Sequence, residues 1–136
     1  MSDTKVDTSV FVTEDNVFDV IVEYYKINNK IYVKGVHDDF DASQVSSKLN
    51  VALKYPSYGD GEFILSQAKL LYDSFSSDNL GVRDLLTLEF SRLIVLIRKW
   101  SLSDAVTKEN IAKINPSIIK GLTNGIRNVI GMDGIL

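Results

Sequence analysis

The chain has 136 residues, 45% of them hydrophobic and 24% charged, and a formal net charge of −3. That length predicts one domain with a core of its own, and the acidic balance argues against a nucleic-acid partner. The absence of cysteine excludes disulfides, thiolate metal sites and cysteine nucleophiles. No run of about 18 apolar residues is present, so the sequence predicts no membrane span and a cytoplasmic protein.

The first third of the chain is predicted to be rich in β-structure. Residues 1–8 are polar and are expected to form a disordered tail. From Asn16 to Lys26, β-branched and aromatic side chains recur at every second position, which is typical of a strand. Asn28-Asn29 fits a two-residue type I′ turn, because asparagine tolerates a positive φ, and residues 31–36 are predicted to be the return strand.

A short helix, a strand and a loop are predicted between this hairpin and residue 61. Asp41 begins a capping pattern, which predicts a helix over residues 42–49. Residues 50–55 are expected to be extended and to end at Pro56, because the residue before a proline avoids the α region. Residues 57–61 are expected to be a loop that leads into the helical part of the chain.

The remainder of the chain is predicted to be helical. A helix over residues 62–75 is followed by a long central helix over Arg83–Trp100. Residues 93–97 of the central helix are apolar on every side, so they must be buried in this chain or against a partner. That requirement makes the central helix the most informative segment of the sequence.

Two further helices follow the central one. Thr107 is predicted to cap a short helix, and Asn115-Pro116 has the residues that begin another, with Asn as the N-cap and Pro in the first turn. This last helix contains Gly121 and Gly125 one turn apart. Each glycine costs about 1 kcal/mol of helix stability relative to alanine, so the pair suggests the close approach of another backbone.

No cluster of residues predicts catalysis, a cofactor or a metal site. The only histidine, His37, lies beside aspartates at positions 38, 39 and 41, but this spacing matches neither an EF-hand nor a zinc motif. The cluster is interpreted as an acidic turn in which Asp41 caps a helix. Asp60 and Glu62 form a carboxylate pair that suits the start of a helix, where negative charge is favourable.

Two stretches of the chain resemble a known group of proteins. They are NVALKYPSYGDGEFILSQAKLLYDS and VRDLLTLEFSRLIVLIRKW, and the later TKENIAKINPSIIKGLTNGI continues the pattern. A strand that ends in Tyr-Pro-Ser, an acidic helix start and a long apolar helix that ends in Trp resemble small tail-morphogenesis proteins of tailed bacteriophages. This group includes tail assembly chaperones and baseplate or hub-associated proteins. The resemblance covers residues 50–130 and leaves out the hairpin.

The resemblance implies binding to other phage tail proteins and no catalytic residues. A chaperone of this kind binds the tape-measure protein in the host cytoplasm before the tail polymerises, whereas a hub-type protein keeps a place in the virion tail. A second copy of the chain is a further candidate partner, because the two halves of the sequence differ in charge. The alternatives left open are therefore an assembly factor, a structural subunit that joins neighbours through its hairpin edge and termini, and a small enzyme that uses His37.

The sequence as a whole predicts an α+β protein. A disordered tail over residues 1–8 precedes a single domain over 9–136, in which residues 9–55 are β-rich and residues 62–131 form a bundle of four to five helices. The leading hypothesis is a non-enzymatic phage tail assembly factor that binds a partner helix in an apolar groove between the central and last helices. The predicted partner-binding residues are Leu93, Leu96, Trp100, Ile119, Leu122 and Ile126.

Overall fold

A computed structural model of the chain describes residues 10–73 and 80–131, and it describes side chains for residues 10–70 and 88–131. The predicted tail over residues 1–8 and the apolar C-terminal residues lie outside the described part. Within the described part, the chain is a mixed α+β protein, as the sequence predicts. None of the helices there is both long enough and apolar enough to cross a membrane.

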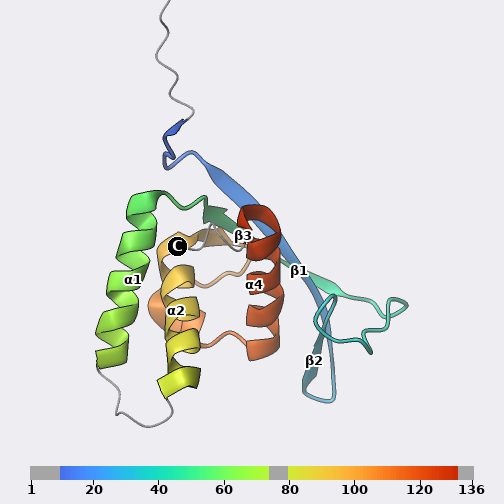
Figure 1. Cartoon of the computed structure of the whole chain (residues 1–136). Coiled ribbons are helices and arrows are strands. Elements are labelled where there is room, and N and C mark those ends of the chain that lie inside the picture. The colour runs from blue at the N-terminus through green and yellow to red at the C-terminus, as the bar shows by residue number, and fades with distance from the viewer. Residues whose placement is uncertain (1–9, 74–79, 132–136) are drawn as a thin grey trace, which may run out of the picture.

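Four strands form one antiparallel sheet in the described part of the chain, with the spatial order β2-β1-β3-β4. They are β1 (Val17–Ile27), β2 (Lys30–Val33), β3 (Ser47–Lys54) and β4 (Ile97–Trp100). The four helices described are α1 (Tyr58–Asp73), α2 (Leu80–Leu96), α3 (Lys108–Ala112) and α4 (Pro116–Ile130). Figure 1 shows α1, α2 and α4 side by side, with α4 in front of β1 and α1 on the far side of α2. We call the face of the sheet on which α4 packs the inner face and the opposite one the outer face.

The hairpin of β1 and β2 forms as predicted. Asn28 and Asn29 both have positive φ values, 52° and 68°, which are the values that a type I′ turn requires. The return strand is shorter than predicted, because the chain turns away after Val33 at Gly35, whose φ is 83°. β2 consequently pairs only with the distal half of β1, over Tyr24–Ile27.

The helix predicted over residues 42–49 is wrong. Asp41 accepts hydrogen bonds from the backbone N–H and the hydroxyl of Ser43, so it closes a turn and caps no helix. β3 begins at Ser47, three residues before the predicted extended segment, because Ser47 to Lys54 pairs along β1 in one continuous register. Pairing with a long neighbouring strand therefore outweighs the local capping pattern.

The loop predicted over residues 57–61 is the first turn of α1. The hydroxyl of Ser57 accepts a hydrogen bond from the Asp60 N–H, and the Asp60 carboxylate accepts one from the Ser57 N–H. This reciprocal pair satisfies two backbone donors that a helix start leaves free, with Asp in the place where a capping box usually has Glu or Gln. α1 therefore begins at Tyr58 instead of Glu62.

The central helix ends four residues before its predicted end. α2 stops at Leu96, and the next residue begins β4, which adds to the edge of β3 with Trp100 opposite Val51. A strand therefore lies within the range predicted to be entirely helical. Residues 93–97, which must be buried because they are apolar on every side, are covered within this chain. Leu93, Leu96 and Ile97 are buried in the core, and Ile94 and Val95 are partly buried against it.

α4 packs closely on the inner face of β1 and β2, with Ile118, Leu122 and Ile126 turned into the core. The two glycines make this close approach possible, although the nearest atoms are valine side chains and not the backbone that the sequence analysis predicts. A Cβ added to Gly121 would lie 2.8 Å from Val33 Cγ1, and one added to Gly125 would overlap Val20 Cγ1. The close packing places α4 directly over β1.

Candidate functional site

The inner face of the sheet has an open hollow at one end, beside the start of α4. It has a volume of about 260 Å³ and lies between the sheet and the segment that joins α3 to α4. Its apolar lining comes from all four strands, the two connections that flank α3, and α4, and comprises Tyr24, Ile31, Leu49, Trp100, Leu102, Ile114 and Ile118. We call this hollow the Trp100 groove.

Hydrogen bonds fix the wall of the groove that follows β4. The Trp100 indole N–H donates to the Asp104 carbonyl at 2.6 Å, so the ring cannot turn without losing this bond. The segment is also tied to the edge of β3, because Ser101 N–H donates to the Asn50 carbonyl and Asn50 N–H donates to the Ser101 hydroxyl. The opposite wall is positioned by the Thr107 cap of α3, where the hydroxyl accepts from Asn110 N–H as predicted.

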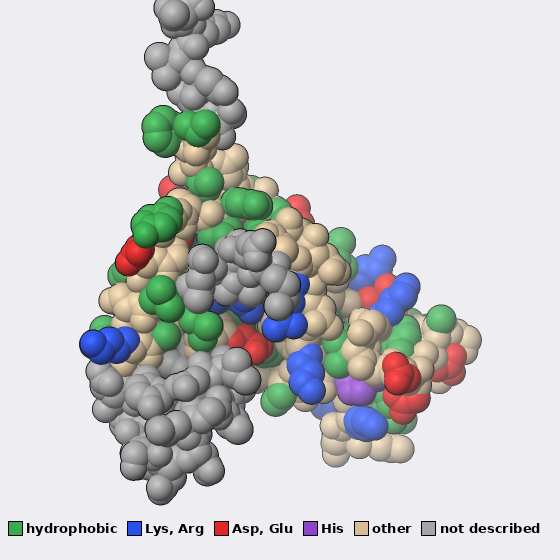
Figure 2. All heavy atoms as spheres, viewed as in Figure 1, with side chains coloured by type: hydrophobic (Ala, Val, Ile, Leu, Met, Phe, Trp, Pro, Cys, Tyr) green, Lys and Arg blue, Asp and Glu red, His purple; other side chains and the backbone are tan. Residues whose placement is uncertain are grey.

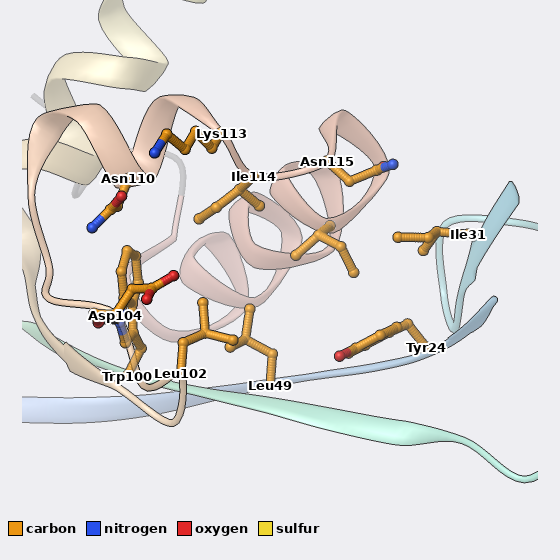
Figure 3. A pocket seen from close by; sticks show the side chains of 11 residues that line it. Tyr24, Ile31, Leu49, Trp100, Leu102, Asp104, Asn110, Lys113, Ile114 and Asn115 are labelled. Carbon is orange, nitrogen blue, oxygen red and sulfur yellow. Dashed lines mark hydrogen bonds between the residues drawn. The ribbon is translucent and has the colours of Figure 1, made fainter. Parts of the chain in front are cut away.

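The side chains converge on a space that no described residue fills. In Figure 3, Leu49 and Leu102 meet at the floor, Ile114 points down toward them, and Trp100 and Tyr24 stand at opposite ends. Leu49 and Ile118 are buried, whereas Leu102 is 44% exposed. Polar side chains, among them Asp104 and Lys113, lie at the rim. This is an apolar floor with a polar margin, the arrangement found at the centre of protein interfaces.

The size of the groove limits what it can hold. Pockets for small organic ligands usually measure about 300–1,000 Å³ and enclose most of the ligand, whereas this hollow is smaller and open. Its lining includes no serine, histidine or cysteine that could act as a nucleophile or base. Among the described residues, the groove is therefore suited to one or two apolar side chains of another chain.

Four of the six predicted partner-binding residues lie in the core. Leu93, Leu96, Leu122 and Ile126 are at most 1% exposed, because α2 and α4 both direct them toward the sheet. A partner could contact these four only if the helices separated. Of the other two, Ile119 is partly buried against the core, and Trp100 lines the groove described above. Their role in binding stays a prediction, and only Trp100 belongs to an open hollow.

Leu102 and Ile114 complete the groove and were not predicted from the sequence. Both are lone apolar residues within polar connecting segments, and that is the signal that could have indicated them. Trp100 was selected, but as the end of a helix rather than as the end of an edge strand. The sequence could not bring these residues together with Tyr24 and Leu49, which lie about fifty or more positions earlier in the chain.

His37 has a structural position at the end of β2. Its Nδ1 accepts a hydrogen bond from the Val33 N–H at 2.9 Å, and its ring lies against Tyr32. Tyr25 stacks on Tyr32 on the outer face, and its hydroxyl accepts from the Asp41 N–H. Within the described residues, no group of three or more His, Cys, Asp or Glu side chains could hold a metal ion. The hydrogen bond from Val33 gives His37 a clear role in closing the hairpin.

A buried ion pair that was not predicted from the sequence joins the end of β3 to the first turn of α1. The Lys54 side chain is only 4% exposed, and its ammonium donates to the Asp60 carboxylate. Glu14 lies farther away, with Oε2 3.7 Å from Nζ, and is largely exposed. Although partial burial favours the neutral acid, the Lys54 ammonium and the Ser57 donors hold the pKa of Asp60 below its ordinary value. The carboxyl is therefore ionised at neutral pH and supports both Lys54 and the start of α1.

Comparisons with models of protein families, with curated proteins and with solved structures found no match to this chain.

Proposed function

We propose that this chain is a non-enzymatic binding protein that holds an apolar segment of another protein in the Trp100 groove. The observation that carries the proposal is the open apolar floor between Leu49, Leu102 and Ile114, with tryptophan and tyrosine at its two ends. Aromatic side chains of this kind dominate the binding energy of many interfaces, because they bury a large area and keep a polar atom at the edge.

The resemblance to tail-morphogenesis proteins extends the proposal to the kind of partner. We take the partner to be another phage tail protein, with the tape-measure protein or a hub protein as candidates. A helix of that protein would insert one or two apolar side chains into the groove, in the way that amphipathic helices bind apolar grooves. The groove then replaces the helix-lined site predicted from the sequence, four of whose residues are buried.

A structural subunit of the tail or baseplate is the second candidate. The observation in its favour is that part of the edge of β1 has no neighbouring strand among the described residues, since β2 covers only Tyr24–Ile27. Unpaired strand edges invite pairing with another chain. The two candidates differ in whether the chain is present in purified virions: a structural subunit is present there, and an assembly chaperone is not.

The groove can be tested by site-specific cross-linking in the cells that produce the chain. A photoreactive amino acid placed at position 102 is expected to capture one discrete protein, because Leu102 is exposed at the groove floor. The matched control is the same group at position 65, because Leu65 is an equally exposed leucine that lies on α1. Equal capture at both positions, or none at position 102, would contradict the proposed groove.

A second measurement uses the captured protein once it is purified. Leu102→Arg is expected to weaken its binding by about tenfold or more, because the charge would enter an apolar floor. Leu65→Arg should leave binding unchanged. If the captured protein is not a tail component, the groove is still supported as a binding site, but the proposal that its partner is a phage tail protein fails. Finding the chain itself in purified virions would favour the structural subunit.

A further inference from the structure

A second hollow, unrelated to the Trp100 groove, lies beside the proximal half of β1. It has a volume of about 410 Å³, and its lining includes Ile21 of β1, Lys34 after β2, and Gly121, Gly125 and Arg127 of α4. The hollow is where a further strand would lie if β2 continued along β1. α4 extends over β1 and so forms one wall of this space (Figure 1).

The edge of β1 beside this hollow has no neighbouring strand among the described residues. Residues of an antiparallel strand direct both their N–H and C=O groups to one edge, and alternate residues use opposite edges. The Glu23 carbonyl accepts from Lys34 N–H on the β2 side, whereas the Asn16 carbonyl accepts from Tyr55 N–H on the β3 side. Asp19 and Ile21 therefore direct their main-chain groups to the same edge of β1, where Ile21 lines the hollow, and no described residue makes a backbone hydrogen bond to them there.

The start of the chain supplies a segment with the complementary properties. Val10 and Phe11 are 73% and 65% exposed, and Figure 2 shows hydrophobic side chains at the surface where the described chain begins. In residues 4–11, TKVDTSVF, the β-branched residues Val6, Thr8 and Val10 occupy every second position, as in a strand. This segment, which we call the N-terminal arm, is long enough to span Val17–Glu23.

Charge favours the same pairing. Lys34 and Arg127 line the hollow, and no acidic side chain of the described residues does. The first nine residues carry Asp3 and Asp7 against a single lysine, Lys5. Pairing one β1 edge with another β1 edge is less favourable, because it would gather two copies of Asp19 and Glu23 on one face.

A tight reversal before β1 does not bring the arm of the same chain into register with this hollow. The turn before β1 is closed by a hydrogen bond from Asn16 N–H to the Thr13 carbonyl. A tight reversal at this turn would place the hydrogen-bonded pairs at even-numbered residues of β1, which already bond to β3. The residues with free groups, Asp19 and Ile21, are odd-numbered. A second copy of the chain has no such restriction.

We propose that the N-terminal arm of one copy adds as a strand to the β1 edge of a second copy, beneath α4. The arm supplies main-chain hydrogen bonds to Asp19 and Ile21, and its β-branched residues, which share one face of the strand, cover the exposed side chain of Ile21. Because each copy has one arm and one edge, the contact either closes a dimer by reciprocal exchange of arms or continues head to tail through further copies. This inference does not depend on the Trp100 groove or on its partner.

The test is light scattering coupled to size exclusion, on the full chain over a range of concentrations. The wild-type mass is expected to rise above the 15.2 kDa of one chain as concentration increases. Val10→Asp replaces a strand-favouring apolar residue of the arm with a residue that strands disfavour, and Ile21→Pro removes the N–H that faces the hollow. Each variant is expected to have a mass of 15.2 kDa at every concentration. Val45→Asp, a control at a valine that is 95% exposed elsewhere, should associate like the wild type.

Mixing the two variants gives the decisive result. Val10→Asp retains a normal edge and Ile21→Pro retains a normal arm, so an equimolar mixture is expected to form a complex of two chains and nothing larger. A mixture that stays monomeric, or a wild-type chain that is monomeric at every concentration, overturns the proposal. Ile21→Thr keeps the N–H and should still associate. If Ile21→Pro does not fold, unchanged association of Val10→Asp still overturns the proposal.

Discussion

Asp60→Ala is expected to lower the free energy of unfolding by about 3–5 kcal/mol, because it leaves the buried ammonium of Lys54 without its close partner. Glu14 offers only a distant and exposed replacement, so little of the loss should be recovered. The capping bonds between Ser57 and Asp60 are lost in the same variant, which adds to the effect. Urea unfolding at neutral pH measures the change.

Two control variants separate the buried charge from the other effects. Asp60→Ala combined with Lys54→Met should be more stable than Asp60→Ala alone, since the methionine carries no charge to be buried. Glu14→Ala should cost about 1 kcal/mol or less, because its bonds to Arg98 and Lys54 are made at the surface. A double variant no more stable than the single one would contradict the assigned role of Lys54.

The same pair predicts a dependence of stability on pH. The folded-state pKa of Asp60 lies below the unfolded value, so the carboxylate contributes stability above about pH 3.9, the ordinary pKa of aspartate. This contribution is lost as the pH falls through the lower, folded-state pKa. The unfolding free energy of the wild type is therefore expected to drop on acidification below about pH 4, and the drop should be smaller in Asp60→Ala. Equal slopes in the two proteins would contradict the assignment.

Gly125→Ala is expected to destabilise the protein by about 1–3 kcal/mol, although alanine favours helices by about 1 kcal/mol. The new Cβ would overlap Val20 Cγ1, whereas Val20 Cβ and Cγ2 would lie at ordinary contact distance. Valine has few alternative rotamers, so α4 itself must move away from the sheet. Thermal unfolding of the full chain measures the loss.

Alanine substitutions at two other glycines test whether the close contact with Val20 causes the loss of stability. Gly121→Ala should cost less than Gly125→Ala, because its Cβ would lie 2.8 Å from Val33 Cγ1 and 3.0 Å from Val22 Cγ1. Gly59→Ala in the first turn of α1 is the matched control, since the nearest atom would be Ser57 Oγ at 3.8 Å. That variant should be neutral or slightly more stable. A stabilising Gly125→Ala would show that α4 packs less closely than described.

Several local features were correctly predicted because neighbouring residues alone determine them. The Asn28-Asn29 turn needs two residues that accept positive φ, and the start of α4 needs an acceptor followed by proline. The alternation in β1 separates a buried inner face from an outer face at every position from Phe18 to Glu23. Local conformational preference and the period of side chains are readable from sequence, since they require no knowledge of distant residues.

The features that were wrongly predicted or missed all depend on distant partners. The capping pattern at Asp41 is genuine, but the pairing of Ser47–Lys54 with β1 outweighs the helix it would start. The apolar residues from Leu93 to Ile97 carry no period, so nothing in the sequence separates the end of α2 from the beginning of β4. For the same reason four of the six predicted partner-binding residues lie in the core, because an apolar stripe has the same sequence pattern whether this chain or a partner covers it.

The sequence by itself thus determined an α+β protein, its hairpin, the caps of α3 and α4, and a close approach at Gly121 and Gly125. Tertiary structure alone decided that Ile97–Trp100 would be an edge strand, and that Trp100, Leu102 and Ile114 would meet around an open groove. It also decided that Lys54 would be buried against Asp60. The physical reason is that burial and strand pairing depend on the whole folded chain, which brings together residues that are far apart in sequence, whereas turns and caps depend on a few adjacent residues.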